Sequence, residues 1–594
     1  MKKFLSILLV ACMILGLVAC GGAASSSEAA PASSSEAAPA SSEEAAPASS
    51  EEAAPASSEE AAPSEEPAGE MPVMYSNMGA VDFFQVPWFN ANLTNDNKFC
   101  FETLVGMNAD YELTTECGMS DDCKISEDGL TATVHLRDGL MWHDGEPVTA
   151  DDVVFSIEKG IINGSTLIST ILNTFRNLEG AEEYVAGTAE HVSGITVDAD
   201  GKTITLKFAK VVPNLQWALG EFAILPQHLL KDADFTQLQQ DPFFQKPIGS
   251  GPFYIEEVKM NEYTIYAPFE QYWNGVANFK IQCSANQPET DPDLPEAFRA
   301  GQLDYAFVKN YDQMKACDGL DGVHIHTVSA LYTRWLNVNE YKHAEGEVNQ
   351  LADPRVRQAI AYAIDRKGIS EGLFQGATLP GDGTLTPTGH DWKKTGLETY
   401  DYNPDKAKEL LAEVGWDSSR VLKIVYYYTD QQTVDLMSII QQELAEVGIQ
   451  SEPYLATGDL GTALNSLPTV NNEPSWSEEA VSTVEWDLCY GALAATTILN
   501  YYERFGAGMN SNNAHPVTEE MQALTDALFG TSDVEAQKAA YAAFEEWQSK
   551  EMKIIPLYYS PYWVITSDKV EGNVEKWANP QFGWNWDIQH WTLH

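Results

Sequence analysis

Residues 143–156, with the sequence HDGEPVTADDVVFS, carry an informative local pattern. A polar turn leads directly into an apolar run, which is how many surface helices begin. Thr149 is a residue type that caps helices, and Asp152 falls at the third helical position, from which a carboxylate can bond back to the start of the helix. The stretch therefore predicts a helix over residues 149–159.

On either side of this helix the polarity pattern changes to that of strands. Residues 131–137 and 202–208 alternate apolar and polar side chains, and each run follows a polar turn that ends in glycine. Such alternation is typical of half-buried strands. Helical patterns recur further along the chain, at 354–366, 404–414 and 533–550. The chain is therefore predicted to have a mixed α/β fold.

Two of these helices have clear markers. Within 354–366 an apolar stripe runs along one face, formed by Val356, Ile360, Ala363 and Ile364. The helix over 404–414 has Pro404 at its first position and Gly415 just after its end, the usual places for these residue types.

More motifs follow in order along the chain. They are IGSGPF at 248–253, YWNG at 272–275, DPRVRQAI at 353–360 with Asp365-Arg366, NPDKA at 403–407, EWDL at 485–488 and IPLYY at 555–559. Together with residues 143–156, this series resembles the bacterial extracellular solute-binding proteins of family 5, the dipeptide- and oligopeptide-binding type that serves ABC importers. Each motif alone is weak evidence, but a collinear series over residues 100–560 is specific.

The resemblance implies an α/β, two-lobed, hinged solute-binding protein fold with three domains, which closes on its ligand by hinge motion. The expected segments are 71–102, 226–328 and 555–594 for domain I, 103–225 for domain II, and 329–554 for domain III. Such a protein captures a solute between its lobes and delivers it to a membrane permease driven by an ATPase. We expect it to act as a monomer and to need no cofactor.

For a peptide ligand, the resemblance implies main-chain pairing of an extended peptide and a carboxylate that binds the α-ammonium group. In the family this aspartate ends a pattern like D-L-x-x-x-x-W-x-x-D. Here Leu493 stands in place of the tryptophan and Thr496 in place of the aspartate. Another acid could bind the amine, so a peptide remains the first expectation. An oligosaccharide or another polar solute is the alternative.

Several residues are candidates for contact with the ligand. Trp88, Phe89 and Asn90 belong to an early loop that lines the cleft in the family, and Trp392 lies in a Gly-, Pro- and Thr-rich loop. The others are Tyr426 and Tyr428 at the end of a strand of the second lobe, Asp430 just after it, and Tyr490, Gly491, Leu493, Thr496 and Thr497 near the substituted motif. Strand alternation predicts that Tyr427 points away from Tyr426 and Tyr428.

The N-terminus has the pattern of an export signal. Lys2 and Lys3 precede the apolar run 4–18, which is shorter than the roughly 20 residues that span a bilayer. The sequence LVAC at 17–20, followed by glycine, resembles the lipobox of bacterial lipoproteins, in which the cysteine is lipidated. We therefore expect a signal peptide over 1–19, a lipid on Cys20, and a protein anchored at the extracytoplasmic face of the membrane, as on a Gram-positive surface.

A repetitive segment follows the cysteine. Residues 25–64 are five consecutive octamers, from SSSEAAPA to SSEEAAPS, with a proline in each. The proline interrupts any helix, and the segment has no large apolar side chain to bury. Residues 20–70 are predicted to form a disordered tether with an r.m.s. span of roughly 40 Å.

Charge and cysteine content narrow the possibilities further. From residue 71 onward the chain has 33 basic and 76 acidic residues, or −43, which excludes nucleic-acid phosphates as the main ligand. Cys117 and Cys123 are close enough in sequence to form a disulfide, but ordinary buried cysteines are an equal alternative.

An enzyme and a metal receptor are the rival classes. No HExxH motif and no P-loop occur, so nothing in the sequence argues for a metalloprotease or a nucleotide hydrolase. His324 and His326 share a strand face, and some relatives carry nickel complexes, but a His-x-His pair is more often structural. We expect neither catalysis nor a metal site.

Overall fold

Three larger sheets organise the part of the protein that the computed structural model describes. The described residues are 71–77, 84, 86–88, 96–108, 112–162, 169–284, 293–328, 330–344, 346–458, 461, 464–495, 497–508, 512–574 and 587–594. Residues 69–594 form one unit, so these sheets can be described together. The signal, Cys20 and the octamer repeats lie outside the described residues.

The seven-stranded sheet has the order β12-β21-β11-β1-β10-β9-β8 and mixes parallel and antiparallel pairs. Its strands are β1 (Val73–Ser76), β8 (Phe253–Lys259), β9 (Tyr263–Pro268), β10 (Lys280–Ser284), β11 (Tyr305–Val308), β12 (Val323–Val328) and β21 (Tyr562–Ser567). Helices α1 (Asp96–Cys100), α7 (Leu294–Arg299) and α8 (Tyr311–Cys317) accompany it. Strands from three distant parts of the chain therefore complete one sheet.

The four-stranded sheet is antiparallel, with the order β4-β5-β7-β6. Its strands are β4 (Ser120–Ile125), β5 (Thr131–Leu136), β6 (Ile195–Val197) and β7 (Thr203–Lys207). The accompanying helices are α2 (Ala150–Ile162), α3 (Ser169–Phe175), α4 (Ala181–Val185), α5 (Leu215–Glu221) and α6 (Gln227–Leu230). One hydrophobic core joins this sheet to the seven-stranded one, since Val134 and Tyr266 both belong to it.

The six-stranded sheet has the order β14-β20-β13-β19-β15-β16 and packs against a separate core. Its strands are β13 (Tyr332–Val338), β14 (Leu379–Pro380), β15 (Val421–Tyr426), β16 (Gln450–Leu455), β19 (Leu488–Ala494) and β20 (Ile554–Tyr559). Its helices are α9 (Pro354–Ala363), α10 (Arg366–Gly372), α11 (Pro404–Val414), α12 (Gln431–Glu446), α14 (Glu519–Phe529) and α15 (Val534–Glu551).

Smaller elements complete the description. Three two-stranded ribbons are formed by β2 (Gly106–Met107) with β3 (Leu113–Thr114), β17 (Thr469–Val470) with β18 (Glu473–Pro474), and β22 (Val570–Glu571) with β23 (Thr592–Leu593). The short 3₁₀ helices are η1 (Phe235–Gln240), η2 (Pro242–Gln245), η3 (Gln350–Ala352), η4 (Ile498–Tyr501) and η6 (Ile588–His590).

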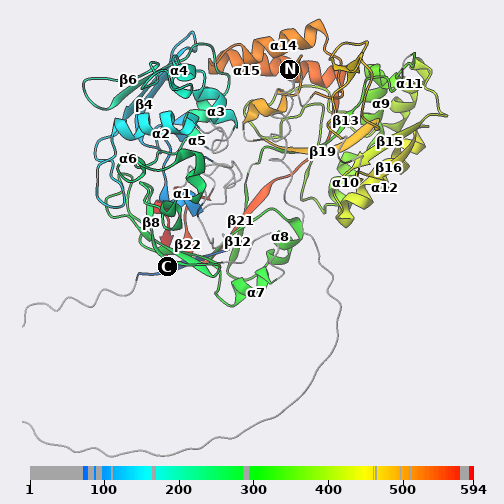
Figure 1. Cartoon of the computed structure of the whole chain (residues 1–594). Coiled ribbons are helices and arrows are strands. Elements are labelled where there is room, and N and C mark those ends of the chain that lie inside the picture. The colour runs from blue at the N-terminus through cyan, green and yellow to red at the C-terminus, as the bar shows by residue number, and fades with distance from the viewer. Residues whose placement is uncertain are drawn as a thin grey trace, which may run out of the picture. The chain divides into compact units, whose positions relative to one another are not determined.

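The seven- and four-stranded sheets, which share one core, form one lobe, and the six-stranded sheet forms the other. The chain crosses between these two lobes at short connections. β12 belongs to the seven-stranded sheet and β13 to the six-stranded one, while β20 and β21 make the reverse crossing. Figure 1 shows the two groups of elements, with α2–α6 in blue to green and α9–α12 in green to yellow. The two-lobed α/β fold predicted from the sequence is confirmed.

Local chemistry explains most element boundaries. In β5 the alternate residues Ala132, Val134 and Leu136 are buried, as the sequence pattern predicts. α11 begins at Pro404, with the Asn403 side chain accepting a bond from a backbone N–H. It ends before Gly415, whose φ of 61° is the left-handed conformation that favours glycine. The predicted helices at 149–159 and 533–550 are α2 and α15.

Other expectations need correction. The helix predicted over 354–366 is α9, but it ends at Ala363, because Ile364 is extended. Asp365 then caps the next helix, α10, by accepting a bond from the N–H of Gly368. At α2, Asp152 accepts a bond from the Thr149 backbone N–H (2.8 Å), but the Thr149 hydroxyl donates to Asp152 instead of capping the backbone. Cys117 and Cys123 do not form the disulfide considered above.

The last of the three segments expected for domain I, residues 555–594, divides between two sheets. β20 pairs with β13 in the six-stranded sheet, and only β21 joins the seven-stranded one. The three-domain division itself stays a prediction. Among the described residues, no helix is both long and apolar enough to cross a membrane.

Candidate functional site

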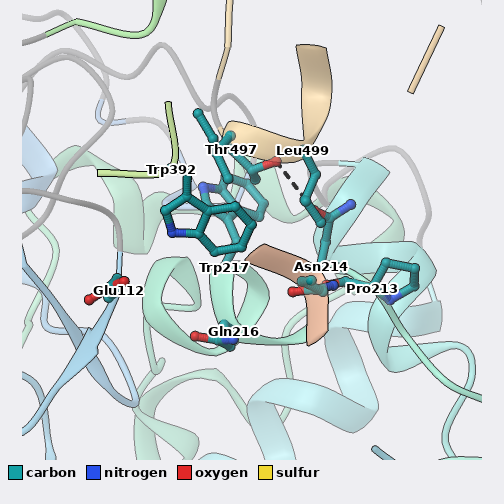
Figure 2. Close-up of a pocket in the computed structure, with 10 residues that line it drawn as sticks. Glu112, Pro213, Asn214, Gln216, Trp217, Trp392, Thr497 and Leu499 are labelled. Atoms are coloured by element: carbon teal, nitrogen blue, oxygen red, sulfur yellow. Dashed lines mark hydrogen bonds between the residues drawn. The ribbon is translucent and has the colours of Figure 1, made fainter. Parts of the chain in front are cut away.

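A small cavity lies where the segment 103–225 meets the segment 329–554. We call it the junction cavity, and it has a volume of about 40 Å³. Its lining residues, shown in Figure 2, are Glu112, Pro213, Asn214, Gln216, Trp217, Trp392, Thr497, Ile498, Leu499 and Gln537. Both lobes thus contribute walls, and two tryptophans and several amide groups are among the lining side chains.

Polar contacts hold the two sides together around the cavity. The Thr497 hydroxyl donates to Asn214 Oδ1 (3.2 Å), the dashed line of Figure 2, and Asn214 Nδ2 donates to Glu503 Oε1 (2.9 Å). Gln537 Nε2 donates to the Pro213 carbonyl (2.9 Å). In Figure 1, α15 (orange) extends toward the group that contains α3 and α4. Ligand pockets usually hold about 300–1,000 Å³, so this cavity must open to admit a solute.

An ion pair also crosses the junction. Lys538 Nζ donates to Glu112 Oε1 at 2.6 Å. Partial burial raises the pKa of Glu112, but bonds from Lys538 and Trp392 outweigh it, so the pKa lies below its usual value. Glu112 is therefore a carboxylate anion on the cavity wall.

One polar atom on the wall has no partner. Among the described residues, the indole Nε1 of Trp217 is buried without a hydrogen-bond acceptor. A buried donor left in this state costs about 1–3 kcal/mol, so an acceptor brought by a ligand would be favoured there.

A second feature lies on the six-stranded sheet. The guanidinium of Arg334 on β13 lies 3.9 Å from the ring centre of Tyr428, 5.2 Å from that of Tyr332 and 5.6 Å from that of Tyr490. The hydroxyls of Tyr490 and Tyr558 are 2.7 Å apart. We call these five residues the tyrosine–arginine cluster. Burial raises the pKa of Tyr428 and the Arg334 charge only partly offsets this, so the phenol stays neutral.

The structure places four predicted candidates in these two features. Trp392 and Thr497 line the junction cavity, and Tyr428 and Tyr490 belong to the tyrosine–arginine cluster. Within each pair the two residues are far apart in sequence, by about 100 residues for Trp392 and Thr497 and about 60 for Tyr428 and Tyr490. Their roles in binding remain predictions.

Other candidates lie elsewhere in the second lobe. Tyr426 is half-buried against the core of the six-stranded sheet, and Asp430 caps α12 by accepting a bond from Thr433 N (2.8 Å). Gly491 lies beside Trp335, and Leu493 packs against a third hydrophobic cluster. None of these four lines the junction cavity.

In the first lobe, Trp88 is fully buried, with its Nε1 donating to the Ala223 carbonyl (2.7 Å) and its ring stacked on Phe222. It has no face toward a ligand in this conformation. Phe89, Asn90 and Thr496, like Cys20, lie outside the described residues.

The predicted orientation of Tyr427 is wrong. Its hydroxyl is 3.0 Å from that of Tyr428, and the two rings are 4.3 Å apart. β15 ends at Tyr426, so strand alternation no longer applies to the residues that follow.

The two histidines considered for a metal have protein partners. His324 Nε2 is 3.0 Å from Asp568, and His326 Nε2 is 3.1 Å from the Thr566 hydroxyl. Among the described residues, no group of three or more His, Cys, Asp or Glu side chains could hold a metal ion.

Sequence reasoning missed Arg334, Arg504, Trp217 and Glu112. An arginine within an apolar strand of so acidic a protein is a signal that could have identified Arg334. A further pattern missed from the sequence is Gly368-Ile369-Ser370-Glu371-Gly372, which matches the GxSxG pattern of serine hydrolases. The Ser370 hydroxyl is buried in α10 and donates to the Thr378 carbonyl, not to a histidine. The geometry is not that of a nucleophile turn.

Comparison with known proteins now places the chain. Residues 114–458 match the profile of the family described as "Bacterial extracellular solute-binding proteins, family 5 Middle". The chain belongs to this family. The matched stretch includes α2 and two residues of the tyrosine–arginine cluster, Arg334 and Tyr428, and it confirms the resemblance inferred from the motifs.

Relatives of this family member are similar over most of its length. The oligopeptide-binding protein OppA of Lactococcus lactis subsp. cremoris is 24% identical over 519 residues, which cover 81% of this chain and 84% of OppA. The substrate-binding protein CtaP of Listeria monocytogenes has a TM-score of 0.67 at 20% identity, covering 88% of this chain and 99% of CtaP. AppA of Bacillus subtilis, solved with a nonapeptide, has a TM-score of 0.60 at 20% identity, covering 88% and 98%. The solved structures support the fold.

Proposed function

We propose that this family 5 protein captures a peptide between its two lobes and delivers it to the permease and ATPase of an ABC importer. The observation that carries the proposal is the junction cavity, whose walls come from both 103–225 and 329–554. Relatives named oligopeptide-binding proteins, and AppA with its nonapeptide, support a peptide as the solute. The division into three domains, with the last boundary moved to about residue 560, is part of this proposal.

Capture by closure needs no covalent step. A ligand that contacts both walls binds the closed form better than the open form, and this difference in affinity drives closure. The contacts Thr497–Asn214 and Gln537–Pro213 exist only when the walls are together. The protein therefore acts as a receptor and not as an enzyme.

Glu112 is our candidate for recognition of the peptide amine. It is an anion on the cavity wall, and Lys538 Nζ occupies the position that an α-ammonium group would take. This supplies a carboxylate although Thr496 stands where relatives carry an aspartate. An incoming ammonium group would replace one cation on Glu112 with another.

The test of the function is binding of a peptide pool by the purified protein. Random pentapeptides should raise the melting temperature, because a ligand that prefers the folded form stabilises it. X-ray scattering should then show a smaller radius of gyration. Malto- and cello-oligosaccharides form the second arm, since Trp217 and Trp392 on the cavity wall could stack on sugar rings. Stabilisation by sugars alone would overturn the peptide proposal.

N-acetylation tests the role of Glu112. Acetylated peptides should bind a few-fold more weakly, because the free amine exchanges with Lys538 on Glu112 and gains only part of the roughly 1.5–3 kcal/mol of a charge-assisted bond. Glu112→Gln should remove most of this difference, whereas Glu182→Gln, an exposed control on α4, should retain it. Equal binding of free and acetylated peptides would exclude an amine clamp at Glu112.

For the N-terminus we propose export through the signal over 1–19 and lipidation at Cys20. The octamer repeats would then act as a tether that holds a monomeric binding body off the outer face of the cell membrane. The lipobox-like LVAC sequence and the proline in every octamer support this proposal.

A further inference from the structure

Among the described residues, Arg334 is a cation without a carboxylate partner, although the protein is strongly acidic. Among the described residues, no carboxylate lies within 4.0 Å of its guanidinium, and its Nη1 is buried without a hydrogen-bond acceptor. Its neighbours are tyrosine rings, with the closest ring centre 3.9 Å away. Cation–π contact with such rings stabilises an ion by less than it costs to take that ion out of water.

Several buried cations of the same lobe have carboxylate partners, whereas Arg366 donates to backbone carbonyls instead. Arg357 is 3.1 Å from Glu340, and Lys553 is 2.6 Å from the same carboxylate. Lys393 is 3.0 Å from Asp382. With 76 acids against 33 basic residues from residue 71 onward, the protein has many carboxylates available. Arg334 differs from these cations because, among the described residues, it has neither a carboxylate partner nor an acceptor for its Nη1.

A second arginine shares this property. Among the described residues, Arg504 has no carboxylate within 4.0 Å, and its Nε is buried without an acceptor. Its guanidinium lies 4.6 Å from the ring centre of Trp335, the residue after Arg334 on β13. Burial lowers the pKa of Arg504 to about 10, so the group remains charged at neutral pH. Tyr427 interacts electrostatically with both guanidinium groups.

Arg504 follows a residue that contacts the wall of the junction cavity, and both arginine side chains are partly exposed. Glu503, which precedes Arg504, bonds Asn214 on the opposite wall of the junction cavity (2.9 Å). Arg334 is close to the β12–β13 crossing between the lobes. The side chains are only partly buried, and Tyr427 beside them is 37% exposed.

We infer that Arg334, assisted by Arg504, binds a carboxylate group of the ligand. The inference rests on the proposed peptide-binding function and narrows its substrates to peptides that present a carboxylate near this cluster. A planar guanidinium matches a carboxylate through two parallel N–H bonds, which suits it to this task better than a lysine. The carboxylate comes either from the peptide C-terminus or from an acidic side chain.

Three peptide pools distinguish these sources. All are random pentapeptides of Gly, Ala, Leu, Phe and Lys. The first has a C-terminal amide, the second a free C-terminal carboxylate, and the third an amide with one Glu added. Equilibrium dialysis with mass spectrometry measures how much of each pool the full-length protein retains. The second or third pool should bind at least ten-fold tighter than the first, and whichever does so identifies the source.

Variants test whether Arg334 is responsible. Arg334→Gln should reduce the preference to less than two-fold while the amide pool binds as before, and Arg334→Lys should retain part of it. Arg504→Gln should weaken the preference in the same direction. Arg299→Gln, an exposed control, should leave it unchanged. Circular dichroism and melting temperature check that each variant is folded.

Two outcomes separate the inference from the proposed function. Equal binding of all three pools, or a preference that survives Arg334→Gln, would overturn the inference and leave peptide binding intact. Failure of every pool to bind the wild-type protein would overturn both.

Discussion

Glu340 should contribute several kcal/mol to the stability of the six-stranded lobe. Its side chain is buried, and its carboxylate binds Arg357 (3.1 Å), Lys553 (2.6 Å) and His515 (2.8 Å). Burial alone would raise the pKa of Glu340, but the neighbouring cations lower it from 4.5 to about 2. The change tested is Glu340→Gln, which preserves shape and removes the charge.

The magnitude follows from the same interactions. A pKa lowered by about 2.5 units corresponds to about 3 kcal/mol of stabilisation at neutral pH. Breaking a buried ion pair costs about 3–5 kcal/mol in general, because the remaining charges are left uncompensated. Arg357 retains Glu551 at 3.0 Å, which favours the lower end of that range.

Urea unfolding followed by tryptophan fluorescence measures the effect. At pH 7, Glu340→Gln should lower the unfolding free energy by about 3 kcal/mol. The control Glu485→Gln alters an exposed pair with Lys423 (3.6 Å) and should change little. Since folding lowers the pKa of Glu340, its contribution is complete above about pH 4.5 and is lost as the pH falls toward 2. A loss no larger than that of the control, or a gap that does not shrink in acid, would refute the reasoning.

Three shorter predictions concern other residues. Gly249→Ala should destabilise the fold by about 2 kcal/mol or more in the same assay, because the added Cβ would overlap the backbone carbonyl of Cys100. The control Gly372→Ala should not destabilise it, because a Cβ at that position meets no atom within 4 Å. Burial lowers the pKa of His515 to about 4, so between pH 6.5 and 4 only the unfolded chain takes up the proton. The free energy of unfolding should therefore fall by about 3 kcal/mol over this range. The same loss in the His515→Gln variant would contradict this. Cys20→Ala should abolish incorporation of radiolabelled palmitate and release the protein into the medium; continued lipid labelling would show that another residue is the anchor.

Much of the fold could be predicted because the responsible forces are local. The alternation in 131–137 and the proline–glycine boundaries of 404–414 act over a few residues, and β5 and α11 agree with them. Where a local rule ended, prediction failed. Tyr427 lies beyond the end of β15, so alternation no longer set its direction. The helix predicted over 354–366 ends at Ala363, because Ile364 is extended and Asp365 caps the next helix.

By itself, the sequence determined the family, the two-lobed α/β fold and the acidity of the body, since these depend on motifs, periodicity and composition. Only the tertiary structure decided which side chains meet. Glu112 and Lys538 pair across 426 residues of chain, and Arg334 is surrounded by tyrosines from other strands and loops. The absence of a carboxylate beside Arg334, among the described residues, is likewise visible only in space. The physical reason is that burial and ion pairing depend on distance in space, which long-range strand pairing sets and no local sequence pattern encodes.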